Sequence, residues 1–331
     1  MKSLKPDRTL RTNGSPHPQG RALLELIGAT PLLSLAKLGA AYPGVRLFAK
    51  AEWFNPGGSV KDRAAASIIG DAEASGRLRP GMTLLDASSG NTAVAYAMIA
   101  AAKGYRATLC VPKNANPQVL ALLAAYGADV VLTDPLQGSD GAILEARRLA
   151  AQHPSTFAYL DQYNNPANWE AHYRTTAPEI WGQTRGTVSH FVAGLGTTGT
   201  FTGTSRRLKE LNPAIRTIAV QPDAAFHGLE GLKHLDSAIV PGIYDPSLPD
   251  DTVFVSTDAA YDAVRRLAQE DGLLVGPSSG AALAGSLQVA TSLAAEAPRA
   301  GATIVMVFPD SGARYAAEGL FGALADRALS A

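Results

Sequence analysis

Residues 83–112, which read TLLDASSGNTAVAYAMIAAAKGYRATLCVP, decide the fold because they run from a strand through a helix into another strand. The segments at 83–87 and 106–112 are mostly apolar without alternation, which is typical of strands buried on both faces. The residues at 92–104 have helical composition, and Gly104 is placed to cap the helix at its C-terminus. This stretch therefore predicts one unit of a parallel sheet that is covered by helices.

The same rhythm of strand and helix extends over most of the chain, and it is interrupted by a polar, irregular stretch at 223–251. Further strands are expected at 128–134, 156–162, 189–196, 216–222 and 302–312, and further helices at 117–127, 140–153, 197–212, 258–272 and within 273–296. The pattern predicts an α/β fold of two open, mainly parallel twisted sheets flanked by helices. A ligand site is expected in the cleft between the two lobes.

The expected domain organisation has three parts. Residues 1–19 are basic and rich in Pro, Gly and Ser, and they predict a flexible N-terminal tail. Residues 52–163 are expected to form a smaller, mobile α/β domain, and residues 20–51 together with 164–331 a larger one. In this division the segment up to about Lys50 packs with the second lobe.

Composition narrows the class of protein. The 331 residues are 46% apolar and 18% charged, which is ordinary for a globular protein. Lys and Arg number 29, as do Asp and Glu, so nothing favours nucleic acid or an anionic membrane as a partner. The single cysteine, Cys110, excludes an internal disulfide. Neither a secretory signal nor a run of about 18 apolar residues is present, so a cytoplasmic location is expected.

One lysine has an unusual position. In the loop Asn55–Ala64, NPGGSVKDRA, Ser59 is a candidate N-cap and Asp62 a candidate partner in a capping box. Lys61 then falls in the first helical turn, where the helix dipole disfavours an ammonium group. Dipole and burial together favour the neutral amine, which is the nucleophilic form.

Three other loops place small residues just before a helix. Gly194–Thr200, GLGTTGT, follows a strand, and its backbone amides and hydroxyls are suited to a phosphate. The next strand ends in Gln221 rather than in an acidic residue, which disfavours a nicotinamide dinucleotide. Ser88–Thr92 suits a carboxylate or serves only as a cap, and Gly276–Gly280 is equally ambiguous. The six histidines lack the spacing of metal ligands, so no metal is expected.

Taken together, these loops resemble those of fold-type II pyridoxal-phosphate enzymes, and most closely the cysteine synthase family. NPGGSVKDR, SGNT, GLGTTGT and GPSSG occur in the order and spacing of that family, and the resemblance extends from about residue 28 to 315. Within the family the chain looks most like the B-type O-acetylserine or O-phosphoserine sulfhydrylases. Two departures stand out, since the family usually has Thr at the position of Ser88 and Gly at that of Ala93.

The resemblance implies roles by position. Lys61 matches the lysine that forms a Schiff base with pyridoxal 5'-phosphate and then acts as a general base. Asn91 matches the residue that hydrogen-bonds the ring oxygen, and Ser278 the hydroxyl that faces the pyridine nitrogen. The cofactor phosphate loop is matched by Gly196, Thr197, Thr198, Gly199 and Thr200. The groups that hold the substrate α-carboxylate are matched by Ser88, Ser89, Gly90, Thr92 and Gln162.

The implied activity is a β-replacement, in which a sulfur nucleophile displaces the activated hydroxyl of O-acetylserine or O-phosphoserine to give L-cysteine. Lys233 lies where phosphoserine-using relatives carry a basic residue, so it is a candidate partner for a substrate phosphate. The resemblance also implies a homodimer, and the sulfur donor is sulfide, thiosulfate or a sulfur-carrier protein. A cystathionine β-synthase, a serine or threonine dehydratase, and a non-catalytic synthase-like regulator or scaffold remain as alternatives.

Overall fold

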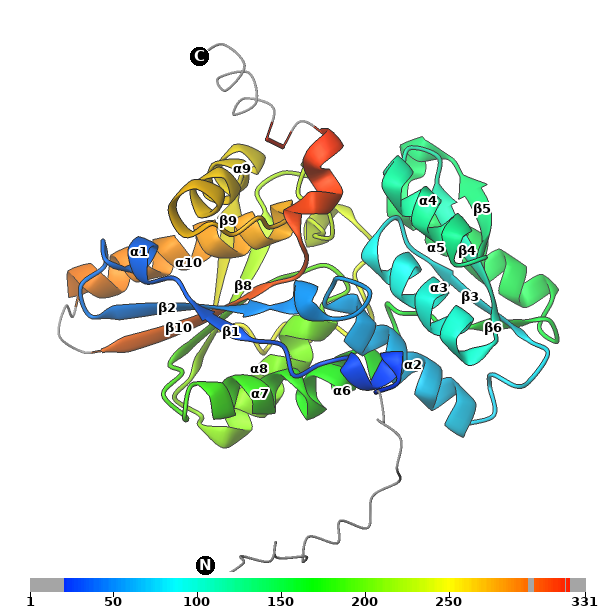
Figure 1. The fold of residues 1–331 in the computed structure, drawn as a ribbon, viewed down its shortest axis with the longest axis horizontal. Coiled ribbons are helices and arrows are strands. Elements are labelled where there is room, and N and C mark those ends of the chain that lie inside the picture. Colours follow the sequence, from blue (N-terminus) through cyan, green and yellow to red (C-terminus); the bar gives the residue numbers. More distant parts are fainter. Residues whose placement is uncertain (1–20, 297–300, 319, 322–331) are drawn as a thin grey trace, which may run out of the picture.

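The computed structural model describes residues 21–296, 301–318 and 320–321, so the expected tail at 1–19 lies outside the described residues. The chain forms two α/β lobes that lie side by side (Figure 1). The smaller lobe has a four-stranded sheet of order β5-β4-β3-β6, and the larger lobe a six-stranded sheet of order β1-β2-β10-β7-β8-β9. The predicted fold class is therefore confirmed.

The larger sheet is parallel except at β1, which pairs antiparallel with β2. Its strands are β1 (Leu32–Ser34), β2 (Val45–Ala51), β7 (His190–Gly194), β8 (Arg216–Pro222), β9 (Asp251–Val255) and β10 (Ala302–Phe308). The sequence analysis did not predict β1, β2 or β9. Strand β1 has three residues, β2 carries Arg46 and Lys50 among its apolar residues, and the apolar run of β9 is limited to Val253, Phe254 and Val255.

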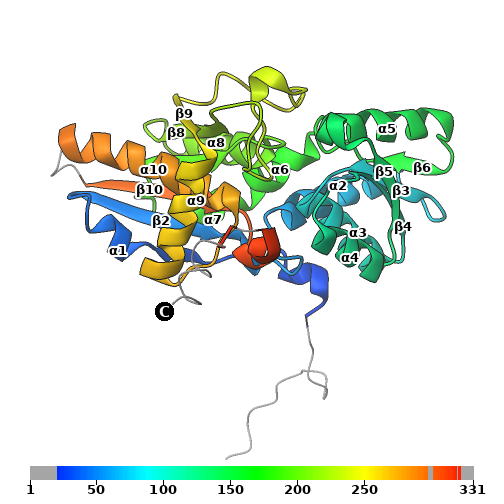
Figure 2. The ribbon, with the colours of Figure 1, turned by 90° about the horizontal axis from the view of Figure 1, so that it is seen from above.

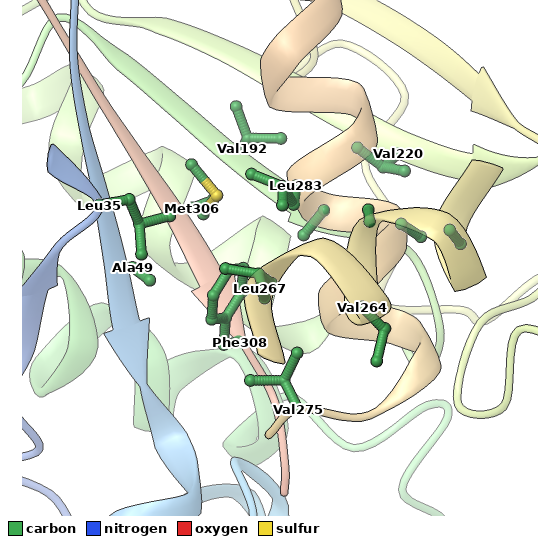
Figure 3. Packing of buried hydrophobic residues seen from close by; sticks show 14 of the residues in the cluster. Leu35, Ala49, Val192, Val220, Val264, Leu267, Val275, Leu283, Met306 and Phe308 are labelled. Carbon is green, nitrogen blue, oxygen red and sulfur yellow. The ribbon is translucent and has the colours of Figure 1, made fainter. Parts of the chain in front are cut away.

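Helices cover both faces of the larger sheet. On one side lie α9 (Thr257–Arg266) and α10 (Pro277–Glu296), and on the other α6 (Ala167–Arg174), α7 (Thr176–Gln183) and α8 (Gly199–Leu211) (Figure 1). Because neighbouring side chains of a strand point to opposite faces, β10 contributes to both cores. Met306 and Phe308 pack with Leu283 of α10 (Figure 3), whereas Val307 packs with Phe201 of α8. Burial of each such side chain contributes about 1.5–3 kcal/mol.

The smaller sheet is parallel throughout and is also covered on both faces. Its strands are β3 (Thr83–Ala87), β4 (Arg106–Pro112), β5 (Asp129–Thr133) and β6 (Phe157–Tyr159), and its helices are α2 (Lys61–Ala74), α3 (Asn91–Lys103), α4 (Pro117–Ala125) and α5 (Gly138–Gln152). Figure 2 shows α5 on one side of the sheet and α3 and α4 on the other. Accordingly, Leu84 packs in one core with Val94, and Leu85 in another with Ile143.

Short helical elements lie in the connections between these strands and helices. They are α1 (Ala36–Gly39), the 3-10 turns η1 (Leu23–Leu26), η2 (Glu52–Phe54), η3 (Pro135–Gln137), η4 (Leu235–Ser237) and η6 (Gly312–Glu318), and the π-helical turn η5 (Leu267–Asp271). Leu24 and Ile27 pack against the core of the smaller lobe. The expectation that the whole segment up to Lys50 packs with the larger lobe is wrong for these two residues. The exact domain boundaries stay a prediction.

Within the described ranges, no helix combines the length and the apolar character needed to cross a membrane. The strands β3, β7 and β10 all end where the lobes meet, and the loops that follow them line the same cavities. The fold thus brings the loop at 88–92 from one lobe against the loops at 194–200 and 309–312 from the other. This is the position at which open parallel sheets usually bind ligands.

Candidate active site

Two cavities with shared walls lie between the lobes. Lys61, Asn91, Gly196 and Thr197 line both of them. The first cavity is also lined by Ser88, Ser89, Gly90, Thr92, Gln162 and Lys233, and the second by Thr198, Thr200 and Ser278. Gly199 lines neither, because its backbone packs against the side chain of Asn168. The structure therefore gathers thirteen of the fourteen sequence-predicted residues around one space and puts Gly199 directly behind them.

Lys61 is the first residue of α2, as the sequence predicts, but the capping box does not form. Ser59 Oγ accepts a hydrogen bond of 3.2 Å from the backbone N–H of Lys61 itself. The carboxylate of Asp62 instead accepts from the backbone N–H of Gly57. The reason is the tight turn at Gly57, where a Cβ would lie 2.4 Å from the Asp62 side chain. The turn and the helix start are thus tied together around the lysine.

The surroundings of Lys61 favour its neutral form. Removal from water lowers the pKa of Lys61, and the negative charges of Asp310 and Glu52 oppose this effect without cancelling it. A lysine that is neutral near physiological pH is a nucleophile and a base.

A buried network of ion pairs holds the first turn of α2 in place. Arg63, two residues after the lysine, pairs with Glu52 and Glu179 at 2.7 Å each, and Lys50 pairs with Glu179 at 2.7 Å. Burial opposes ionisation of Glu179, but hydrogen bonds and charges from Arg63 and Lys50 lower its pKa to about 2. These contacts join α2 to β2 and α7, so they fix the position of Lys61 relative to the larger lobe.

The loop at 88–92 enters α3 at its N-terminus and faces the first cavity. The Thr92 hydroxyl donates to Gln162 Oε1 at 2.8 Å, and Gln162 Nε2 donates to the Ala87 carbonyl at 2.6 Å. The backbone N–H of Gln162 donates to Asp86 at 3.1 Å. Burial raises the pKa of Asp86 to about 7. The N-terminus of α3 and the residues Ser88 and Ser89 line the first cavity, a setting that suits a small carboxylate.

The glycine loop at 194–200 is closely packed and rich in hydroxyls. A Cβ on Gly196 would lie 2.1 Å from the Gly231 carbonyl oxygen, so only glycine fits there. Thr198 has a φ of 69°, and its buried hydroxyl makes no hydrogen bond to any described residue. Thr198 is the N-cap of α8, whose 13 residues begin at Gly199. A buried hydroxyl without a partner, beside free amides at a helix N-terminus, fits a bound phosphate group.

Behind this loop, His172 is buried, and burial lowers its pKa far below the usual value. Its two ring nitrogens lie 2.9 Å from the Thr176 hydroxyl and 3.3 Å from the Thr200 hydroxyl. A neutral imidazole can therefore orient Thr200 toward the second cavity. Ser278 lies in the first turn of α10 with 4% of its surface exposed, and it lines the same cavity.

Lys233 does not present a free charge to the cavity. Its ammonium group lies 2.9 Å from Asp140 on α5, 3.4 Å from the Ser139 hydroxyl and 5.2 Å from the ring centre of Tyr163. Burial opposes ionisation of Asp140, but the hydrogen bond from Lys233 holds its pKa below the usual value. Asp140 also accepts the backbone N–H of Ile239 at 3.0 Å. This ion pair therefore links the irregular stretch at 223–251 to the smaller lobe.

Sequence reasoning missed a polar cluster that follows β10. Tyr315 lines the first cavity, and its hydroxyl donates to Asp310 at 2.6 Å. Asn91 Nδ2 donates to the same carboxylate oxygen at 2.7 Å, and Arg314 donates to Asn91 Oδ1. One signal was available, because PDSG directly follows a buried strand at the sheet edge where ligands bind.

Comparisons with known proteins agree with this geometry. The family described as "Pyridoxal-phosphate dependent enzyme" matches residues 23–310. A cysteine synthase of Aquifex aeolicus is 49% identical over 94% of this chain and 96% of its own length. Cysteine synthase B of Salmonella typhimurium is 42% identical over 91% of this chain and 96% of its own length. Among solved structures, an O-ureido-L-serine synthase superposes with a TM-score of 0.85 and 38% identity, covering 95% of this chain and all of the other.

Proposed function

Because the chain belongs to the pyridoxal-phosphate dependent enzymes, we propose that it makes L-cysteine by β-replacement on an activated serine. The activated hydroxyl of O-acetylserine or O-phosphoserine leaves from Cβ, and a sulfur nucleophile takes its place. The observation that carries the proposal is the meeting of three elements in one space: a buried lysine, a loop suited to phosphate and a loop suited to carboxylate. Relatives named cysteine synthase at 49% and 42% identity support it.

The residues present fit pyridoxal 5'-phosphate. The unpartnered Thr198 hydroxyl, with Thr197, Thr200 and the first amides of α8, would hold the phosphate. Lys61 would hold the aldehyde carbon covalently, and Ser278 would face the ring nitrogen. When bound, the cofactor supplies an electron sink for the charge that develops at Cα of the substrate.

Lys61 has two tasks in this proposal, attachment of the cofactor and proton transfer. Burial lowers the pKa of Lys61, which favours the neutral amine at Nζ when it is not bound covalently. Nζ can then accept the Cα proton of the substrate. The ion pairs of Arg63 with Glu52 and Glu179 keep the start of α2 fixed, so the lysine returns to the same place after each turnover.

The substrate is held by its α-carboxylate. The amides at the start of α3 and the hydroxyls of Ser88 and Ser89 would bind the carboxylate oxygens, and Thr92, whose hydroxyl donates to Gln162 Oε1, would orient Gln162 beside them. The backbone N–H of Gln162 donates to Asp86, and one N–H of its side-chain amide donates to the Ala87 carbonyl. The second N–H of the side-chain amide is left for the substrate. A hydroxyl at Ser278 carries no charge, so it does not hold a proton on the ring nitrogen as a carboxylate would. This favours elimination at Cβ over reactions that need a long-lived carbanion.

The test begins with the purified protein, pyridoxal phosphate and sulfide. O-acetylserine and O-phosphoserine are supplied separately, and cysteine is measured by mass spectrometry. We expect an absorbance band near ~420 nm from the lysine–cofactor linkage, and loss of both band and activity in Lys61→Ala. Lys103→Ala, which removes a surface lysine paired with Glu73, is the matched control and should keep both. A band near 420 nm that persists in Lys61→Ala would count against the assignment.

The same assay separates the alternatives. A serine or threonine dehydratase releases ammonia and an oxoacid without sulfide, and a cystathionine β-synthase requires homocysteine. The likeness to an O-ureido-L-serine synthase favours adding hydroxyurea as a second nucleophile in the assay. Serine and threonine are therefore supplied as well, and a protein that binds the cofactor but turns over neither these amino acids nor the two serine derivatives, with or without these nucleophiles, would be a regulator or scaffold.

Two parts of the proposal rest on the family resemblance alone. They are a homodimeric assembly and a sulfur-carrier protein as a natural sulfur donor, and a cytoplasmic location stays a prediction. Sedimentation of the purified chain tests the first, since the proposal requires a mass near twice 34.4 kDa. The small-molecule character of the substrates follows from the family and from the cavity that they would enter.

A further inference from the structure

The segment after β10 contacts three of the four loops that carry proposed cofactor residues, those of Lys61, Asn91 and Ser278. The backbone N–H of Val60 donates to the Pro309 carbonyl at 2.8 Å, and Ser59 forms a β-bridge with Asp310. On its other side the segment bridges to the turn before α10, where the N–H of Gly276 donates to the Asp310 carbonyl at 3.3 Å. Asp310 therefore lies between the turn that bears Lys61 and the turn that bears Ser278.

The side chain of Asp310 is fully buried and faces a third loop. One carboxylate oxygen, Oδ2, accepts hydrogen bonds from Asn91 Nδ2 at 2.7 Å and from the Tyr315 hydroxyl at 2.6 Å. The other oxygen, Oδ1, has no hydrogen-bond partner among the described residues. A Cβ on Gly276 would lie 2.1 Å from Oδ1, so the glycine turn packs directly on the carboxylate. Two donors on one oxygen favour the charged form of the group.

These contacts fix the orientation of the Asn91 amide. Its oxygen accepts from Arg314, and one of its N–H groups donates to Asp310. Arg314 also donates to the Gly57 carbonyl, in the turn before Lys61. With both ends of the amide assigned, only the second N–H of Asn91 remains for a ligand in the cavity that Asn91 and Lys61 line together.

Asp310 also dominates the charge around Lys61. The negative charges that raise the pKa of Lys61 are those of Asp310, with the larger effect, and Glu52. Glu52 is already neutralised by Arg63 at 2.7 Å. Around Asp310 the facing groups are Lys61 from α2, Asn91 from α3, and Arg314 and Tyr315 from η6. Burial raises the pKa of Asp310 above its usual value, and the hydrogen bonds from Tyr315 and Asn91 and the charge of Arg314 oppose this effect without cancelling it.

We propose that Asp310 is a positioning residue of the cofactor site, which orients Asn91 toward the cofactor ring and whose charge keeps a proton on the lysine–cofactor linkage. This inference rests on the proposed function, because it requires that Lys61 hold the cofactor. Asp310 has a direct effect on Asn91 and a longer-range electrostatic effect on Lys61. It holds Asn91 through a direct hydrogen bond, and it acts on Lys61 through its field in a space from which water is largely removed.

The test for the charge is a pH titration of the cofactor-loaded protein, followed by its absorbance near ~420 nm. Asp310→Asn keeps the shape and removes the charge, so the pH at which the band is lost should fall by about 1 unit or more. If the unchanged protein keeps its absorbance band up to the highest pH of the titration, Asp310→Asn should lose the band at a lower pH within the same range. An equal midpoint in both proteins would overturn the proposal.

Two further variants guard this test. Tyr315→Phe removes one hydrogen bond and leaves the carboxylate, so it should move the midpoint in the same direction by less, even if Asp310→Asn fails to fold. Asp86→Asn removes another buried carboxylate, one that does not act on Lys61, and should leave the midpoint in place. Absence of any band in the unchanged protein would refute the proposed function itself. Failure of the proposed function is therefore distinguished from failure of the proposal for Asp310.

The test for positioning is a double-mutant cycle on cofactor affinity. Asn91→Ala and Asp310→Asn should each weaken cofactor binding about 10-fold, as expected for the loss of one well-oriented hydrogen bond. Because Asp310 acts through Asn91, the affinity of the double variant for the cofactor should be little lower than that of the single variant with the lower affinity. A full multiplication to about 100-fold would show that the two residues act independently and would overturn the positioning role.

Discussion

Gly196→Ala is the sharpest perturbation that the structure offers. Gly196 opens the phosphate-suited loop and has a φ outside the left-handed region, so an alanine backbone is tolerated there. The obstacle is space, because the added Cβ would lie 2.1 Å from the carbonyl oxygen of Gly231. That neighbour is backbone and cannot rotate away. It is further held by the hydrogen bond of 2.8 Å from the N–H of Lys233 to the carbonyl of Leu195.

The expected magnitude follows from this distance. Ordinary van der Waals contact begins at 3.4 Å, so one of the two chain segments must move by more than 1 Å. Overpacking of this kind costs about 1–3 kcal/mol of folding free energy. A shift of about 1 Å in a binding loop can lower the affinity for its ligand on the order of 100-fold. We therefore expect a modest loss of stability and a large loss of cofactor binding.

Two measurements check the prediction. Urea unfolding of the cofactor-free protein gives the free energy of unfolding, and absorbance near ~420 nm at increasing cofactor concentration gives the affinity. Gly70→Ala is the matched control, since nothing lies within 4 Å of its added Cβ and the residue is inside α2. It should stabilise the protein by about 0.5–1 kcal/mol and leave cofactor binding unchanged. If Gly196→Ala unfolds and binds like the unchanged protein, the reasoning from close packing is wrong.

The other predictions concern ion pairs. Lys233→Ala should lower kcat/KM for O-phosphoserine more than for O-acetylserine, and equal losses would remove Lys233 as a phosphate partner. Asp140→Asn frees the Lys233 charge and should raise the O-phosphoserine to O-acetylserine ratio of kcat/KM about 10-fold, whereas Asp245→Asn, which breaks a similarly exposed pair, should leave that ratio unchanged. Glu179 has a pKa lowered to about 2, so its stabilisation is complete above pH 4.5 and is lost as the pH falls through 2. In Glu179→Gln we expect stability at pH 7 to fall by about 2 kcal/mol and its dependence on pH between 4.5 and 2 to flatten, as measured by urea unfolding.

Local patterns in the sequence were sufficient for most of the strands and helices and for the helix-start loops, but not for β2, α6 or α7. Apolar runs such as 106–112 predict buried parallel strands because burial on both faces leaves no polar alternation. Lys61 stood out because a lysine at a helix start opposes the dipole. Strands β1, β2 and β9 and the missing capping box were not predicted in this way. The apolar runs of these strands are short or interrupted by charged residues, and the partner of Asp62 was decided by a turn at Gly57 that forms only when the chain is folded.

The roles of the four loops came from recognising their order and spacing, since the unaided sequence left a carboxylate site and a simple helix cap equally open at Ser88–Thr92. The structure adds the common space that all four loops line. It also shows that Lys233, the candidate partner for a substrate phosphate, has a carboxylate partner of its own, because Asp140 lies 2.9 Å away on the other lobe.

The sequence alone therefore determined the α/β architecture and an oddly placed lysine beside loops suited to anions, because these depend on hydrophobic runs and on residues a few positions apart. Only the tertiary structure decided which charges surround that lysine. Asn91 and Asp310 are 219 residues apart, and Asp140 and Lys233 are 93 apart. Such pairs meet because two separate sheets end at one cleft, and no local pattern records which side chains will face each other there.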